Sequence, residues 1–220
     1  MSITALGNQD PMGPVTWEDA AALTSFQIFS HIDAAVRFSQ NNAFSDELIK
    51  IQFEGMYMNS QAFMSDSMYW AEEWKILGSI AAAAGVMNAA FPWKIFEKKD
   101  INLAGSAAGT QKYVDFSHSL AYPAFSQDIK KSKEYENMCA HVIATLCKKQ
   151  HDYGHENIAR FGRTGLLVRV HDKIARLNNL LSRGVDPANE TIEDTYVDIV
   201  GYSAIGMMVE RGWFGLQLSQ

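Results

Sequence analysis

Three carboxylates follow one another at a spacing of four residues near the C-terminus: Glu190, Asp194 and Asp198. If this segment is a helix, they lie along one stripe, because a helix has about 3.6 residues per turn. Like charges at this spacing repel each other, and no lysine or arginine occurs between residues 190 and 210 to balance them. Carboxylate oxygens are the ligands that Mg²⁺ and Mn²⁺ prefer. Either a divalent cation or the basic face of the preceding helix can balance these charges, and we predict that the three residues hold one of these ions.

A group of basic residues precedes the carboxylates. Arg169, Lys173 and Arg176 have the spacing i, i+4, i+7 and share one face of a helix. Arginine offers a phosphate group a planar pair of donors, and lysine offers a compact positive charge. We predict that these three residues bind phosphate, with Asp172 either paired with them or part of the metal site.

The chain places the two groups on neighbouring helices. Apolar residues recur at helical spacing from Leu166 to Leu181, and Gly184 and Pro187 interrupt the chain before the acidic segment. The predicted result is a helical hairpin with a phosphate-sized basic surface beside a metal-sized acidic surface. In the alternative interpretation the charges are solvated faces or ordinary ion pairs, such as Asp172 with Arg176.

Three short motifs span residues 149–202. They read K-x-x-D-Y-G-x-x-N over 149–157, G-L-x-V-R-x-x-D-K-x-x-R-L over 165–177 and E-x-x-x-D-x-x-x-D-x-x-x-Y over 190–202. In this combination the chain resembles the nucleotide modification associated domain, which is found mainly in phages and prophages. It is more distantly similar to the all-α nucleoside triphosphate pyrophosphohydrolases of the MazG and dimeric dUTPase type. The resemblance covers roughly the last third of the chain.

The resemblance implies an all-α fold and a role in processing or recognising nucleotides. The pyrophosphohydrolase families further imply Mg²⁺ held by carboxylates and hydrolysis between the α and β phosphates. Those enzymes carry a Glu-x-x-Glu pair on the helix before the acidic ladder, where this chain offers only Asp172. The resemblance therefore implies nucleotide binding more strongly than hydrolysis.

We assign each candidate residue a role in catalysis, metal binding or nucleotide binding. In an enzyme the metal lowers the pKa of the attacking water, and Asp152 or Asp172 is the general base. The metal ligands are Glu190, Asp194 and Asp198. The predicted nucleoside phosphate contacts are Lys149, Tyr153, Asn157, Arg169, Lys173 and Arg176.

Two other functions are compatible with these residues. The domain can be a non-catalytic interaction or assembly module, whose charges form salt bridges between subunits. As a minor alternative, the His-Asp doublets at 151–152 and 171–172 resemble those of metal phosphohydrolases. A zinc site at His151 and His155 is not expected, because Gly154 ends the helix between them.

The remaining sequence predicts a helical bundle. Apolar periodicity and capping residues indicate helices over about 16–40, 45–59, 65–87, 127–153 and 190–209. Residues 1–15 are expected to form an extended arm, and residues 100–125 a surface loop or a lid. We predict an all-α protein in which an N-terminal helical layer (1–125) packs on a C-terminal three-helix unit (126–220).

Composition limits the partners. The 220 residues carry a net charge of −6, which argues against a broad nucleic-acid-binding surface. We find no signal peptide and no apolar run long enough to span a membrane, so we expect a cytoplasmic protein, in the host cytoplasm if a phage encodes it. Cys139 and Cys147 lie about 12 Å apart on one helix, too far for a disulfide. The exposed arm favours a homodimer.

Overall fold

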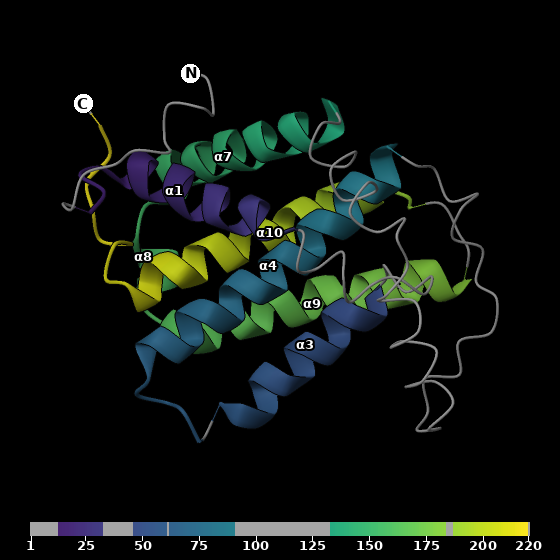
Figure 1. The fold of residues 1–220 in the computed structure, drawn as a ribbon, viewed down its shortest axis with the longest axis horizontal. Helices are drawn as coiled ribbons and strands as arrows, with labels where there is room; N and C mark the ends of the chain where they lie inside the picture. The colour runs from purple at the N-terminus through teal and green to yellow at the C-terminus, as the bar shows by residue number, and fades with distance from the viewer. Residues whose placement is uncertain (1–12, 33–45, 61, 91–132, 184–186, 220) are drawn as a thin grey trace, which may run out of the picture.

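A computed structural model describes residues 13–32, 46–60, 62–90, 133–183 and 187–219 of the chain. Every element in this part of the chain is a helix (Figure 1), so the predicted all-α fold is confirmed. The helices are α1 (Trp17–Ser30), α3 (Asp46–Asn59), α4 (Ser67–Ala90), α7 (Lys133–Tyr153), α8 (Glu156–Ala159), α9 (Gly162–Arg183) and α10 (Ile192–Glu210).

Local capping residues determine where α1 and α10 begin. The Thr16 hydroxyl accepts a hydrogen bond from the Asp19 N–H, and the Asp19 carboxylate accepts one from the Thr16 N–H. Thr191 and Asp194 form the same reciprocal pair at the start of α10. Each pair satisfies N–H groups that the first turn of a helix leaves without partners. The predicted cap at Thr16 is confirmed, whereas α10 begins two residues after Glu190.

Other helix ends agree with the sequence to within a few residues, with two exceptions. α1 ends at Ser30 with His31 as its C-cap, which interrupts the predicted helix, and the predicted end near residue 40 lies outside the described residues. The four-residue helix α8 was not predicted. α7 ends at Tyr153 as expected, because Gly154 has a φ of 64°, which glycine adopts without strain. Most of the predicted arm, the loop over 100–125 and the domain boundary at 125/126 lie outside the described residues.

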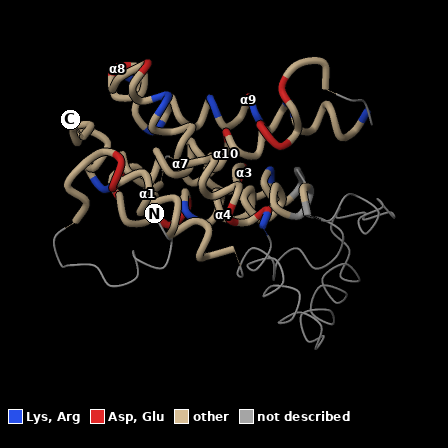
Figure 2. The backbone as a smooth tube through the Cα atoms, turned by 90° about the horizontal axis from the view of Figure 1, so that it is seen from above, with Lys and Arg blue, Asp and Glu red and all other residues tan. Residues whose placement is uncertain are grey.

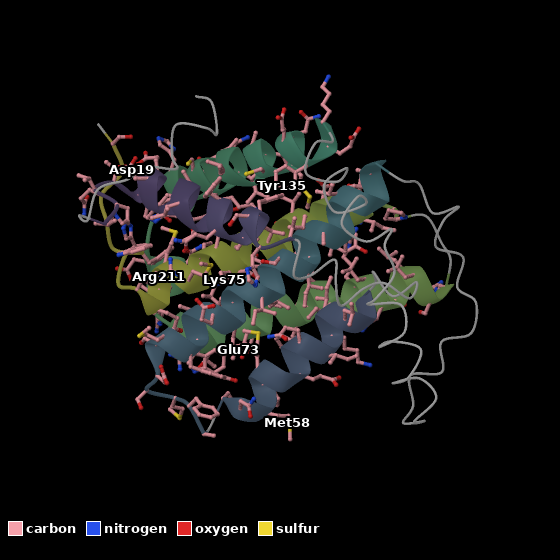
Figure 3. The ribbon with its side chains drawn as sticks, viewed as in Figure 1. Asp19, Met58, Glu73, Lys75, Tyr135 and Arg211 are labelled. Atoms are coloured by element: carbon pink, nitrogen blue, oxygen red, sulfur yellow. The ribbon has the colours of Figure 1, made fainter. Side chains whose placement is uncertain are left out.

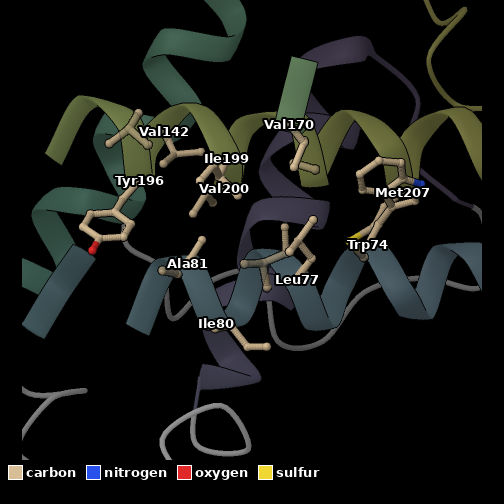
Figure 4. Close-up of a cluster of buried hydrophobic side chains, with 14 of the residues drawn as sticks. Trp74, Leu77, Ile80, Ala81, Val142, Val170, Tyr196, Ile199, Val200 and Met207 are labelled. Atoms are coloured by element: carbon tan, nitrogen blue, oxygen red, sulfur yellow. The ribbon is translucent and has the colours of Figure 1, made fainter. Parts of the chain in front are cut away.

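Helix α10 forms the centre of the bundle. It contacts α1, α4, α7 and α9, and it runs beside α4 along much of its length (Figures 1 and 4). Trp74 and Leu77 of α4 pack against Ile199 and Met207 of α10 in the buried core. A Cβ atom at Gly206 would lie 2.4 Å from the Trp74 ring. The glycine therefore allows that ring to lie directly against the α10 backbone.

The predicted core face of α4 is correct except at its first residue. Ala71, Trp74, Leu77 and Ala81 are buried. Met68 was expected to face inward but is 83% exposed. It ends a continuous exposed stretch, residues 62–68, that leads from α3 into α4.

The buried apolar side chains form one cluster with members from α1, α3, α4 and α7 to α10. The N-terminal and C-terminal helices therefore share a core in the described part of the chain. Cys139 is buried, Cys147 is half-buried, and both are free thiols, as expected. None of the described helices is long and apolar enough to cross a membrane.

Candidate functional site

Two lysines from different helices converge on one carboxylate of α10. The Asp198 Oδ1 atom lies 2.8 Å from Nζ of Lys149 on α7, and its Oδ2 atom lies 2.6 Å from Nζ of Lys173 on α9. The Asp198 side chain is only 12% exposed and that of Lys173 20%, whereas that of Lys149 is 49% exposed. The predicted phosphate-binding and metal-binding helices thus face each other, as the sequence indicated. They are in direct ionic contact across their shared face.

Glu190 completes this group from the loop that precedes α10. Its carboxylate lies 3.3 Å from Nζ of Lys173. Burial lowers the pKa of Lys173, but its hydrogen bonds and charge interactions with Asp198 and Glu190 outweigh that effect and raise the pKa above its usual value. Lys173 therefore keeps its positive charge at neutral pH. We call Lys149, Lys173, Glu190 and Asp198 the ion cluster.

Arg176 and Asp194 hold the start of α10 in place. The Arg176 guanidinium donates to the carbonyl oxygens of Glu190 and Thr191 and to the Thr195 hydroxyl. Asp194 accepts hydrogen bonds from the Thr191 hydroxyl and backbone N–H, which lower the pKa of its carboxyl group. Both residues were predicted to bind ligands, and in the structure both stabilise the beginning of the helix.

The regular acidic ladder is only partly present. Because α10 begins at Ile192, Glu190 precedes the helix and is not one turn below Asp194 on the same stripe. The three carboxylates instead contact different groups: Lys173, the capping Thr191, and the two lysines. No group of three or more His, Cys, Asp or Glu residues suited to a metal ion occurs in the described ranges. The Mg²⁺ or Mn²⁺ site remains a prediction.

The other predicted site residues lie on the outer surface. Asp152, Tyr153 and Asn157 are exposed around the turn between α7 and α8. Asp172 is exposed on α9, and Arg169 is half-buried there; neither side chain has a hydrogen bond or ion pair within the described residues. The pair of Asp172 with Arg176, which belonged to the alternative interpretation of the charges, does not occur among the described residues. Figure 2 shows α8 and α9 along one edge of the molecule, with charged residues distributed along them.

The histidines engage other groups. The His151 ring lies 3.4 Å from the neighbouring Asp152 carboxylate at the exposed end of α7. His155 contacts the Gln150 side chain and the Leu216 carbonyl, which ties the C-terminal segment to the turn after α7. Both ring nitrogens of His155 therefore have partners within the chain. The ring of His171 contacts Phe53 of α3, and the His-Asp doublets are not gathered into a metal site in the described part of the chain.

Two depressions border the ion cluster. A small groove of about 20 Å³ runs between α7 and α10 beside Lys149 and Asp198, and Thr145 and Tyr202 supply its other polar side chains. A wider hollow of about 380 Å³ lies between the end of α9 and the loop before α10. Its lining residues are Arg176, Asn179, Leu180, Pro187, Ala188, Asn189 and Glu190. The hollow falls within the usual size range of small-molecule sites, about 300–1,000 Å³.

One buried ion pair was not singled out from the sequence. Arg163 at the start of α9 makes two hydrogen bonds of 2.6 Å to Glu210 at the end of α10, and its guanidinium lies 4.4 Å from the Trp70 ring. The Glu210 side chain is nearly fully buried. The two residues are 47 positions apart, so no local spacing could reveal the pair.

Comparison with known proteins adds one finding. Residues 149–209 match the family model described as nucleotide modification associated domain 1. The chain matches no curated protein and no solved structure. The matched segment begins at Lys149 and ends within α10, so it contains all four residues of the ion cluster. Residues 149–209 are therefore similar to nucleotide modification associated domain 1, and the ion cluster belongs to this segment.

Proposed function

We propose that this protein binds a nucleoside phosphate at the ion cluster, in the cytoplasm, as part of nucleotide metabolism. One observation carries the proposal. Within the segment similar to a nucleotide modification associated domain, the ammonium groups of Lys149 and Lys173 approach the same carboxylate from two different helices. Two ammonium groups this close to each other can attract a phosphate group.

The accessible part of this site is the Lys149 ammonium group. An ammonium group has three donors, and the only described partner of Lys149 is Asp198. A phosphate that approaches from solvent can use the remaining donors without breaking the Lys173–Asp198 pair. The nucleoside would then lie along the hollow lined by Arg176, Asn179 and residues 187–190, which adjoins Lys173 through Glu190.

Magnesium enters this proposal together with the nucleotide. Mg²⁺ is commonly held by one or two carboxylates, with phosphate oxygens and water as the remaining ligands. Asp198 and Glu190 would supply the carboxylates, and both now contact lysine, so those ion pairs must rearrange when the ion binds. The bound ion would neutralise phosphate charge. The proposal concerns binding; hydrolysis by Asp152 or Asp172 remains a separate prediction.

The experiment measures nucleotide affinity by titration calorimetry, with and without Mg²⁺, for the wild-type chain and two matched variants. Lys149→Met removes the accessible ammonium group and should weaken binding at least about tenfold, the effect of a lost charge-assisted contact of about 1.4 kcal/mol. Lys148→Met changes the neighbouring exposed lysine, which has no ion pair within the described residues, and should leave the affinity unchanged. Equal affinities of the two variants would remove the cluster from the binding site.

A third variant tests the role of the carboxylate. Without Mg²⁺, Asp198→Asn should bind nucleotide more tightly than the wild type, because a competing anion has been removed from both lysines. With Mg²⁺, the same variant should lose the additional affinity that the metal gives the wild type. An Asp198→Asn variant that retains the full Mg²⁺ effect would exclude Asp198 as a metal ligand.

A second function is favoured by a different observation. The charges of the ion cluster neutralise one another within the chain, as they would in a purely structural arrangement. In that case the protein is a non-catalytic interaction module. The absence of binding by any nucleoside mono-, di- or triphosphate, with or without Mg²⁺, would favour this function.

A further inference from the structure

Large apolar side chains are exposed on α3 and on the turn that joins it to α4. We call these residues the α3–α4 surface. Its members are Ile51, Tyr57, Met58, Phe63, Met64 and Met68. Met58 is 77% exposed, and its side chain points away from the other helices (Figure 3). Isolated exposed apolar residues are common on soluble proteins, but six within 18 residues form a group that calls for a partner.

The turn that carries this surface is held by buried and half-buried groups. The Phe63 carbonyl accepts a hydrogen bond of 2.8 Å from the Trp70 indole, and the Met64 carbonyl accepts one of 2.6 Å from Arg163. The Phe63 ring also stacks on that of Tyr69, with centroids 4.5 Å apart. The backbone at Phe63 and Met64 is therefore held in place while their side chains remain exposed. A surface fixed in advance loses little entropy when a partner binds.

Gly55 lies in the middle of the exposed face of α3. It follows Ile51 by four residues and precedes Met58 by three, so the three share one stripe. A Cβ atom at Gly55 would have no neighbour within 4 Å. Glycine in the middle of a helix is less favourable than alanine, and nothing in the described fold requires it here. Close approach of a second backbone is one use of such a glycine.

The size of the surface indicates the kind of partner. Together the six side chains expose roughly 570–750 Å², if each has a total accessible area of about 150–200 Å². This sum is at or above the range of about 300–600 Å² for the largest apolar patch on a monomer. With its polar rim it approaches the roughly 800 Å² per partner of a standard interface. We propose that the α3–α4 surface binds a second copy of this chain, with α3 of one copy packed on α3 of the other around a two-fold axis.

The charges at the edge of the α3–α4 surface are compatible with the binding of a second copy. Lys50 and Glu54 flank the stripe one turn apart, with Nζ and Oε1 4.0 Å from each other, so the rim carries both signs of charge. In a two-fold interface each residue contact occurs twice, and a rim of a single sign would repel its copy. An antiparallel arrangement centred near Gly55 also brings Ile51 of each copy toward Met58 of the other, so the apolar ends of the two stripes meet.

Sedimentation velocity over a range of protein concentrations tests this proposal. The wild-type chain should be a dimer that dissociates on dilution. Met58→Glu places two like charges in the interface and should raise the dimer dissociation constant at least about tenfold. Gly55→Leu should do the same by preventing close approach, although the monomer has room for the side chain. Val168→Glu is the matched control, because Val168 is similarly exposed but lies on α9, and it should leave the dimer intact.

Each outcome is informative. A dimer that Met58→Glu and Gly55→Leu weaken, and that Val168→Glu leaves intact, supports the α3 interface. A chain that stays monomeric at 100 times the concentrations used for binding assays, or a dimer that only Val168→Glu dissociates, overturns it. If the chain is monomeric, the proposal is wrong even when the α3–α4 surface binds an apolar dye that Met58→Glu releases. Near-ultraviolet circular dichroism confirms that each variant is folded.

Discussion

Replacing Lys173 by methionine tests whether the ion cluster contributes to the stability of the fold. The variant keeps the length of the side chain and removes its charge. Exposed ion pairs contribute up to about 1 kcal/mol, whereas removing one member of a fully buried pair costs about 3–5 kcal/mol. The Lys173 and Asp198 side chains are 20% and 12% exposed, so their pair is closer to the buried limit. Lys149 still contacts Asp198 in the variant, and we therefore expect a loss of about 2 kcal/mol.

Urea unfolding at pH 7, followed by circular dichroism, measures this loss. A loss of about 2 kcal/mol corresponds to a melting temperature lower by roughly 4–8 °C in a chain of this size. Lys149→Met should cost less than about 1 kcal/mol, because solvent screens the more exposed ammonium group. Lys148→Met is the control for the loss of a surface charge. In 1 M salt the small effect of Lys149→Met should disappear, while most of the effect of Lys173→Met should remain.

The reasoning fails if Lys173→Met and Lys149→Met cost the same, or if neither differs from Lys148→Met. Equal costs would mean that the two lysines contribute alike despite their different exposure. No difference from Lys148→Met would mean that the ion cluster adds no measurable stability to the packing of α7, α9 and α10. A double-mutant cycle with Asp198→Asn isolates the pairwise energy. A coupling energy near zero between residues 173 and 198 would contradict the structure directly.

Three further predictions concern other parts of the bundle. Asp194→Ala removes the capping box and should lower the free energy of unfolding by about 1 kcal/mol at pH 7. The pKa of Asp194 is lowered in the folded state, so this stabilisation is fully present above the unfolded pKa of about 3.9. It should vanish as the pH falls through the lower pKa of the folded state. Arg163→Met leaves the Glu210 carboxylate buried without its partner and should lower the free energy of unfolding in urea by about 3–5 kcal/mol. A loss smaller than that of Lys173→Met would contradict the buried geometry. Burial raises the pKa of the Cys139 thiol to about 11, so mass spectrometry after iodoacetamide treatment at pH 8 should find Cys139 unmodified until the protein is unfolded.

The sequence alone determined the fold class and most of the helices. Helical periodicity, threonine caps and Gly154 are local signals, since each depends on residues within a few positions of one another. For this reason the ends of α3, α7 and α10 were predicted to within a few residues, apart from residues that the structure does not describe. The same local reasoning placed Lys173 of α9 near Glu190 and Asp198, because a short connection makes two helices neighbours.

Tertiary structure alone decided what the charged residues do. Spacing treated Glu190, Asp194 and Asp198 as equivalent, yet they respectively contact Lys173, the helix cap at Thr191, and lysines from two helices. Whether a carboxylate is available to a metal depends on which donors reach it from other helices, and sequence spacing carries no information about them. The Arg163–Glu210 pair and the exposure of Met68 were missed for the same reason: burial and ionic partners are set by contacts between distant segments, whereas periodicity reports only the geometry within one helix.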